Sequence, residues 1–110
     1  MNERDKQLIN AILKHYGELL EELENIHTLE EFVEQRTQSK AIKLDLLQIG
    51  ENVNHLSEES KLQLLKRDLV GIIDIRNQVA HGYITLEDNT IWETLHVDLP
   101  VLIEQIKNIQ

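Results

Sequence analysis

Two side chains that could act on a phosphodiester, Arg76 and His81, lie in one short stretch of the sequence, Arg-Asn-Gln-Val-Ala-His-Gly-Tyr. Histidine is the usual side chain for moving protons, because its unperturbed pKa lies closest to neutrality. Arginine carries a planar fork of donors that suits a phosphodiester and the charge that builds on its transition state. Together they could cleave RNA without a metal, with one group deprotonating the 2′-hydroxyl and another protonating the leaving 5′-oxygen.

A helix is expected to hold this stretch in place. If it runs from about Leu69 to His81, three apolar residues share one narrow face and form its buried stripe, Ile72, Ile75 and Val79. Arg76 then lies beside the stripe at the edge of the core, and His81 lies on the opposite side. Gly82 is the residue type that most readily ends a helix in the left-handed conformation. The histidine is therefore expected at a helix C-terminus, with Tyr83 just beyond it.

One histidine per chain is too few for a separate acid and base. A two-fold dimer that brings two copies of the stretch together would supply the second one. The alternative interpretation is structural, with Arg76 in an ion pair at the core edge and His81 merely ending its helix. The spacing of the two residues, taken alone, favours the structural interpretation.

Apolar residues recur at helical spacing along four long segments of the chain. Helices are expected over residues 3–25, 40–56 and 69–81, and from residues 88–90 to near the C-terminus. No segment alternates polar and apolar residues over the length of a strand. The sequence therefore predicts an all-α fold, an up-and-down bundle of four main helices plus short ones, in a single domain that spans residues 1–110.

Polar residues are expected to mark where helices begin and bend. A short helix should start at Leu29 and carry Phe32 and Val33 inward, followed by a polar turn over residues 36–40. A second short helix is expected over residues 58–66. The residues expected to cap helix N-termini are Thr28 with Glu31, Ser57, Asp68, and Thr90 with Glu93. Pro100 cannot donate to the carbonyl of His96, and it should kink the last helix near its middle.

The helix over residues 40–56 has two apolar faces. One face is the narrow stripe formed by Ile42, Leu46, Ile49, Val53 and Leu56, and the other carries Leu44 and Leu47. Gly50, in the middle, costs about 1 kcal/mol of helix propensity relative to alanine unless it lets another backbone come close. Because a bundle of this length has few helices to surround a central one, the second face is expected to lie at a homodimer interface together with the helix that carries Arg76.

Composition and charge exclude several classes of protein. The 110 residues contain no cysteine, which excludes disulfides and thiolate metal sites and fits a cytoplasmic location. No apolar run is long enough to span a membrane, and residues 1–6 do not resemble a signal peptide. The net charge of −9 argues against a broadly basic surface for DNA or RNA, so any contact with RNA must be local. Neither a bound metal nor a cofactor is expected from the motifs present.

The stretch that carries Arg76 resembles a known family. Residues 74–83, followed by Ile91-Trp92-Glu93-Thr94 and Asp98-Leu99-Pro100, are similar to the HepT-like family of HEPN domain toxins. Upstream, Ile49-Gly50-Glu51 and Leu56-Ser57 resemble the third helix of the same family, so the resemblance covers nearly the whole chain. Arginine, four residues, histidine, any residue and tyrosine is the signature of this family. One departure is Lys66-Arg67-Asp68, where many members have a loop that contains proline and tryptophan.

This resemblance implies a dimeric, metal-independent endoribonuclease toxin of a type II or type VII toxin–antitoxin pair. The implied partner is a minimal nucleotidyltransferase antitoxin encoded beside it, and the implied substrate is RNA. By resemblance Arg76 and His81 are the catalytic residues of a cleft at the dimer interface, while Asn77 and Tyr83 contact the substrate. Tyr83 matches the position at which such antitoxins attach AMP, and this AMPylation would silence the cleft.

A second function remains open at this point. The chain could be a non-catalytic helical subunit that presents a substrate or a docking surface to a nucleotidyltransferase. The net charge of −9 favours this alternative, whereas the intact Arg76–His81 motif favours the enzyme.

Overall fold

The computed structural model describes residues 1–80 and 87–110, without the side chains of residues 79 and 80. In this part of the chain every regular element is helical, which confirms the all-α prediction. The elements are α1 (Glu3–Leu23), α2 (Leu29–Glu34), α3 (Arg36–Asn54), α4 (Glu58–Lys61), α5 (Lys66–Ala80), α6 (Asp88–Glu93), the π-helical turn η1 (Thr94–Asp98) and α7 (Leu99–Lys107). No helix of the described residues is long and apolar enough to cross a membrane.

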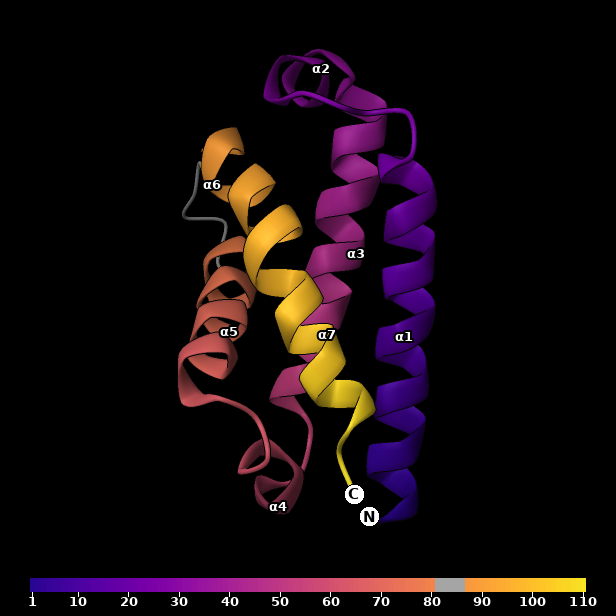
Figure 1. Cartoon of the computed structure of the whole chain (residues 1–110), viewed down its shortest axis with the longest axis vertical. Helices are drawn as coiled ribbons and strands as arrows, with labels where there is room; N and C mark the ends of the chain where they lie inside the picture. Colours follow the sequence, from indigo (N-terminus) through magenta and orange to yellow (C-terminus); the bar gives the residue numbers. More distant parts are fainter. Residues whose placement is uncertain (81–86) are drawn as a thin grey trace.

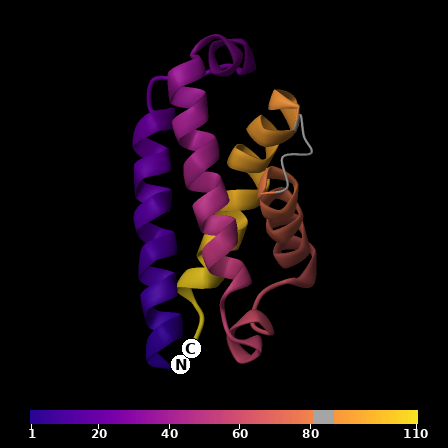
Figure 2. The same cartoon turned by 180° about the vertical axis from the view of Figure 1, so that it is seen from behind.

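The long helices run alternately up and down the molecule (Figure 1). Helices α1 and α3 lie side by side in both views, and α5 packs against the other side of α3 (Figures 1 and 2). The segment from α6 through η1 to α7 forms the fourth long element and contacts both α5 and α1. The N-terminus and the C-terminus lie next to each other at the end where α4 lies. This arrangement confirms the up-and-down bundle of four main helices.

Isoleucine and leucine side chains from all four long elements form one core. The stripe predicted for α3 is buried as expected, and Ile72 and Ile75 of α5 are buried with it. The last element contributes a further set, Ile91, Leu95, Leu99, Leu102 and Ile106. Burying one such side chain contributes about 1.5–3 kcal/mol, so these stripes hold the four elements together. Leu44, on the second face of α3, is 59% exposed and lies outside the core.

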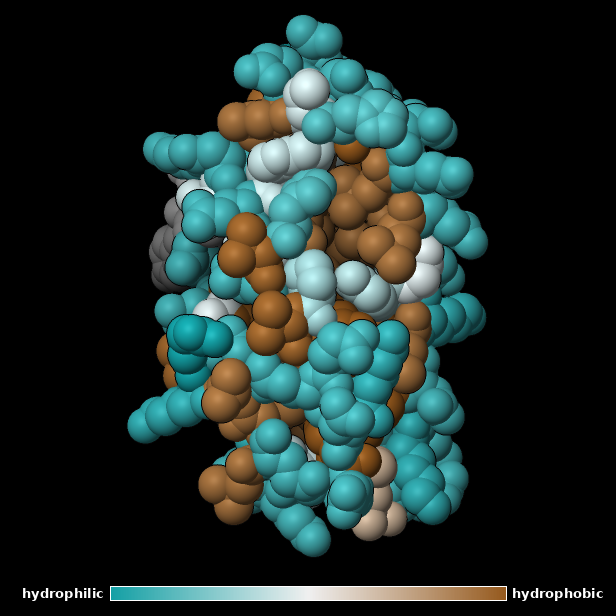
Figure 3. Space-filling model, viewed as in Figure 1, coloured by the Kyte–Doolittle hydropathy of each residue, from teal (hydrophilic) through white to brown (hydrophobic). Residues whose placement is uncertain are grey.

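The outer surface over α7 is mostly hydrophilic, with separate apolar groups between the polar ones (Figure 3). Two of the exposed apolar residues are Val97 on the turn η1 and Val101 on α7.

Two of the expected caps are present. The Thr28 hydroxyl accepts a bond from the Glu31 N–H at 3.1 Å, and the Glu31 carboxylate accepts a bond from the backbone N–H of His27 at 2.9 Å. The Ser57 hydroxyl accepts a bond from the Ser60 N–H at 3.3 Å and begins α4. These bonds satisfy backbone donors that the first turn of a helix leaves without partners. Helix α4 ends at Lys61, shorter than predicted.

The other two caps were predicted wrongly. Helix α5 begins at Lys66, so Asp68 lies within its first turn, where its buried carboxylate accepts a bond from the Gln105 amide at 2.8 Å. Helix α6 begins at Asp88, two residues before Thr90, and its N-terminus has no side-chain cap. In both places the helix starts earlier than the cap pattern suggests. The Asp68 carboxylate makes a tertiary hydrogen bond to α7 and does not cap its own helix.

The segment around α2 also differs from expectation. The polar residues from Arg36 to Lys40 form the first turn of α3, not a turn between helices. The buried Ser39 hydroxyl donates to the Phe32 carbonyl and thereby ties this first turn to α2. Val33 is 47% exposed instead of pointing inward, because α2 is a single short helix whose core position is filled by Phe32.

Pro100 interrupts the last helix through a change of helix type. The turn η1 is π-helical, and the Leu99 N–H that follows it bonds to the Thr94 carbonyl. Pro100 then falls in the first turn of α7, where a missing N–H removes no bond from the middle of a helix. The structure thus has a π turn over Thr94–Asp98 shortly before Pro100, whereas the sequence predicted a kink at this place.

Candidate active site

The site begins with a close approach of α3 and α5 at Gly50. A Cβ atom at this position would lie 2.9 Å from the Arg76 Cβ and 3.2 Å from the Ile72 carbonyl oxygen. Only glycine leaves room for the two helices at this distance, which confirms the role expected for Gly50. The approach places the residue after Gly50, Glu51, beside the stem of Arg76.

Arg76 is held by two oxygen atoms. Its Nε donates to a Glu51 carboxylate oxygen at 2.6 Å, and its Nη1 donates to the side-chain oxygen of Asn77 at 2.8 Å. The Arg76 side chain is 24% exposed and that of Glu51 is 32% exposed, so the pair lies at the edge of the core. The guanidinium is therefore anchored on one side and still reachable from solvent.

Glu51 bridges two partners, Arg76 and His55. Its second carboxylate oxygen lies 2.8 Å from the His55 Nε2. The bond from Arg76 and then the bond with His55 lower the pKa of the Glu51 carboxyl, against a smaller opposing effect of burial. The bond between Glu51 and Arg76 also raises the pKa of the Arg76 guanidinium above its usual value. Since a carboxylate only accepts hydrogen bonds, His55 carries a proton on Nε2.

The structure gives part of the predicted site. It brings Arg76 and Asn77 together on α5, with Ile72 and Ile75 on the buried side as expected. The helix continues to Ala80, directly before the predicted histidine. His81 and Tyr83 themselves lie outside the described residues.

Two members of this cluster were missed by the sequence reasoning. Glu51 appeared only as part of a resemblance, and His55 was not among the candidate residues. The signal that could have found them is local, because Glu51 and His55 are four residues apart on one helix and Glu51 follows the midhelix glycine. The ion pair with Glu51 also shows that the structural interpretation of Arg76, a core-edge salt bridge, is satisfied in this structure.

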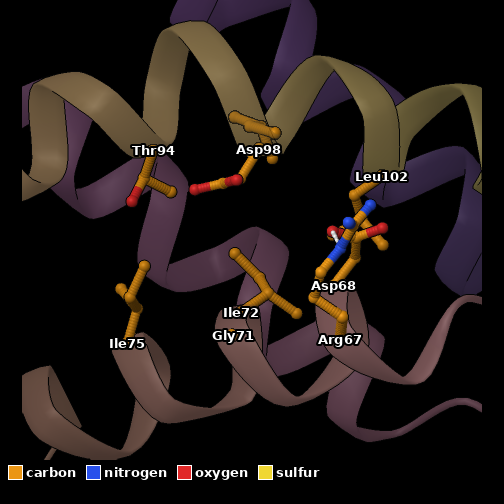
Figure 4. A pocket seen from close by; sticks show the side chains of 9 residues that line it. Arg67, Asp68, Gly71, Ile72, Ile75, Thr94, Asp98 and Leu102 are labelled. Atoms are coloured by element: carbon orange, nitrogen blue, oxygen red, sulfur yellow. Dashed lines mark hydrogen bonds and ion pairs between the residues drawn. The ribbon is translucent and has the colours of Figure 1, made fainter.

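A pocket of about 200 Å³ lies on the opposite flank of α5, between this helix and the segment of η1 and α7 (Figure 4). Its floor is apolar, and its polar lining comes from Arg67 and Asp68 on α5 and from Thr94 and Asp98 on η1. Asp68 is already bonded to Gln105 and Arg67. Among the described residues, neither Arg76 nor Asn77 lines this pocket.

A second polar cluster lies between α1 and α3. The His15 Nδ1 is 3.1 Å from an Asp45 carboxylate oxygen and 3.7 Å from a Glu18 carboxylate oxygen. Ligand atoms of these three residues lie within 4.8 Å of one another, close enough to hold a cation. A partly exposed histidine between two carboxylates is equally well explained as an ion pair.

The comparisons with known proteins identify a family of ribonucleases. A family model described as "Ribonuclease HepT-like" matches residues 12–109. A protein of Caldanaerobacter subterraneus subsp. tengcongensis, named as a putative RNase, is 31% identical over 101 residues, which cover 92% of this chain and 89% of that protein. No solved structure matches the chain significantly.

Proposed function

Because the chain belongs to the HepT-like ribonuclease family, we propose that it is a metal-independent endoribonuclease toxin that acts in the cytoplasm through Arg76 and His81. The observation that carries this proposal is the Arg76 guanidinium. It is anchored through Nε and Nη1 near the end of α5 and is partly open to solvent. It precedes a histidine in the motif that the matched segment contains.

In the proposed reaction the 2′-oxygen of RNA attacks the adjacent phosphorus, and the bond to the 5′-oxygen breaks. His81 moves the protons, which leave the 2′-hydroxyl and arrive on the departing 5′-oxygen. Arg76 binds the phosphate oxygens and stabilises the negative charge that grows on them. Asn77, bonded to the Arg76 Nη1, orients the guanidinium and contacts the substrate. The products are a 2′,3′-cyclic phosphate and a 5′-hydroxyl.

The cleft of this enzyme is proposed to lie at a homodimer interface. The second face of α3 carries the exposed Leu44, which the core of one chain does not cover. Helix α5 packs beside α3, so a partner that covers this face would also approach Arg76. A two-fold axis there would bring two copies of His81 to one cleft and supply both the acid and the base.

Chelation tests the proposed function most directly. Purified protein is expected to cleave a labelled RNA equally well with and without EDTA, and to leave a 2′,3′-cyclic phosphate or a 3′-phosphate end. The measurement is gel analysis of the cleavage rate and of the chemistry at the new ends. The matched variant is Asp45→Asn, which removes one ligand from the group of His15, Glu18 and Asp45 and should leave cleavage unchanged.

Loss of cleavage in EDTA that Mg²⁺ restores would contradict the metal-independent mechanism. Absence of cleavage together with stable binding to a nucleotidyltransferase would favour the other function, a non-catalytic docking subunit. Two observations favour the docking subunit, namely the net charge of −9 and the ion pair between Arg76 and Glu51.

Regulation is proposed to act on Tyr83. The partner is a minimal nucleotidyltransferase antitoxin that transfers AMP from ATP to the tyrosine hydroxyl and releases pyrophosphate, which places a phosphodiester near the motif. Its negative charge would compete with RNA for the Arg76 fork. Co-expression with the neighbouring transferase should add one adenylyl group per chain, measured by intact mass, and should abolish cleavage. A Tyr83→Phe variant that the partner silences as well as wild type would contradict this switch.

A further inference from the structure

The guanidinium of Arg76 has one occupied side and one end to which no described residue bonds through Nη2. It carries five N–H groups, of which the Nε–H is bonded to Glu51 and one on Nη1 is bonded to Asn77. Both N–H groups of Nη2 and one of Nη1 have no partner among residues 1–80 and 87–110. Among the described residues, the end of the fork therefore meets no acceptor on Nη2, whereas its Nε side is occupied by a carboxylate.

Glu51 is fixed on both sides. Gly50 sets the distance between α3 and α5 next to it, Arg76 holds one of its oxygens, and His55 holds the other at 2.8 Å. A carboxylate with a lowered pKa stays charged and accepts both bonds throughout the neutral range. Its geometry is thus determined by two helices, not by one flexible ion pair on a surface.

We propose that Glu51 is a positioning residue of the RNA-cleaving site, which holds the Nε side of Arg76 so that the Nη1–Nη2 end of the fork meets the phosphate. The inference rests on the proposed function, and it adds a residue that does not touch the substrate. His55 serves as the second anchor of the Glu51 carboxylate. The RNA phosphate binds end-on at Arg76 and leaves the bond to Glu51 in place.

The charge of Glu51 gives this role a distinctive signature. A carboxylate beside a phosphate site repels the substrate, so its removal should keep or strengthen RNA binding. Loss of the charge also weakens the bond that holds the guanidinium, because a neutral amide oxygen is a weaker acceptor than a carboxylate. A small misplacement of a catalytic group can cost as much as about 100-fold in rate. If Glu51 positions Arg76, removing its charge should therefore lower kcat for RNA cleavage without raising KM.

The test variant is Glu51→Gln, which keeps the size of the side chain and removes its charge. We expect kcat for RNA cleavage to fall about tenfold or more while KM stays equal or decreases. The matched control is Asp45→Asn, which neutralises another partly buried, histidine-paired carboxylate of α3 and should change neither constant. Circular dichroism and thermal melting establish that each variant is folded. If Glu51→Gln does not fold, Glu51→Asp, which keeps the charge and shortens the side chain, tests positioning through the fall in kcat alone.

A second measurement asks whether Glu51 acts through Arg76. In an Arg76→Lys background the fork is absent, so Glu51→Gln should cause no further fall in kcat. A folded Glu51→Gln enzyme with wild-type kcat would overturn the inference, and so would an equal loss in both backgrounds. Wild-type protein that does not cleave RNA would overturn the proposed function instead, and this inference with it.

Discussion

Replacing His81 with alanine is expected to lower the rate of RNA cleavage by about 100-fold or more, the usual contribution of a positioned acid–base group. The expected loss lies in kcat, because proton transfer belongs to the transition state and not to substrate binding. Single-turnover cleavage of a labelled RNA measures it. The control is His27→Ala, a histidine of the exposed segment before α2, which should cleave at the wild-type rate.

Arg76→Lys belongs to the same experiment and should also be impaired. An ammonium is a point charge without the planar fork, so it cannot hold the Glu51 carboxylate and a phosphate with separate edges. Sedimentation of the same samples at micromolar concentration measures the proposed dimer. A His81→Ala protein that cleaves as fast as wild type would rule out the proton-transfer role, and a stable wild-type monomer would remove the paired-histidine mechanism.

The bundle could be predicted from the sequence because periodicity reports burial directly. Ile42, Leu46, Ile49 and Val53 are buried where their spacing requires it. Helix boundaries were harder to predict, since a residue such as Asp68 suits a cap and also suits the tertiary bond that it makes to Gln105. The local sequence does not determine which of these two hydrogen bonds the side chain makes.

Within the site, the sequence predicted contacts between residues of one helix and not the contact between two helices. The spacing of Arg76 and Asn77 follows from one helix, and the structure places them in contact. The bond from Arg76 to Glu51 joins residues that lie 25 positions apart, and no helical period relates them. Gly50 was a clue to this contact, because a costly residue in the middle of a helix indicates a close neighbour without identifying it.

Gly50→Ala is expected to destabilise the fold, although alanine is the better helix former. The change gains about 1 kcal/mol of helix propensity. Against this, the new Cβ would lie 2.9 Å from the Arg76 Cβ and 3.2 Å from the Ile72 carbonyl oxygen. Neither atom is the flexible end of a side chain, so α3 and α5 must move apart, and overpacking of this kind costs about 1–3 kcal/mol. Urea unfolding measures the balance.

Gly17→Ala is the matched control for this prediction. Gly17 lies in the middle of α1, is exposed, and a Cβ placed there has no heavy atom within 4 Å among the described residues. The control should therefore gain up to about 1 kcal/mol in the free energy of unfolding. Gly50→Ala should also lose cleavage activity, because the shift begins at the stem of Arg76, whereas Gly17→Ala should keep it. Equal stabilisation by both substitutions would show that the two helices do not need glycine where Glu51 meets Arg76.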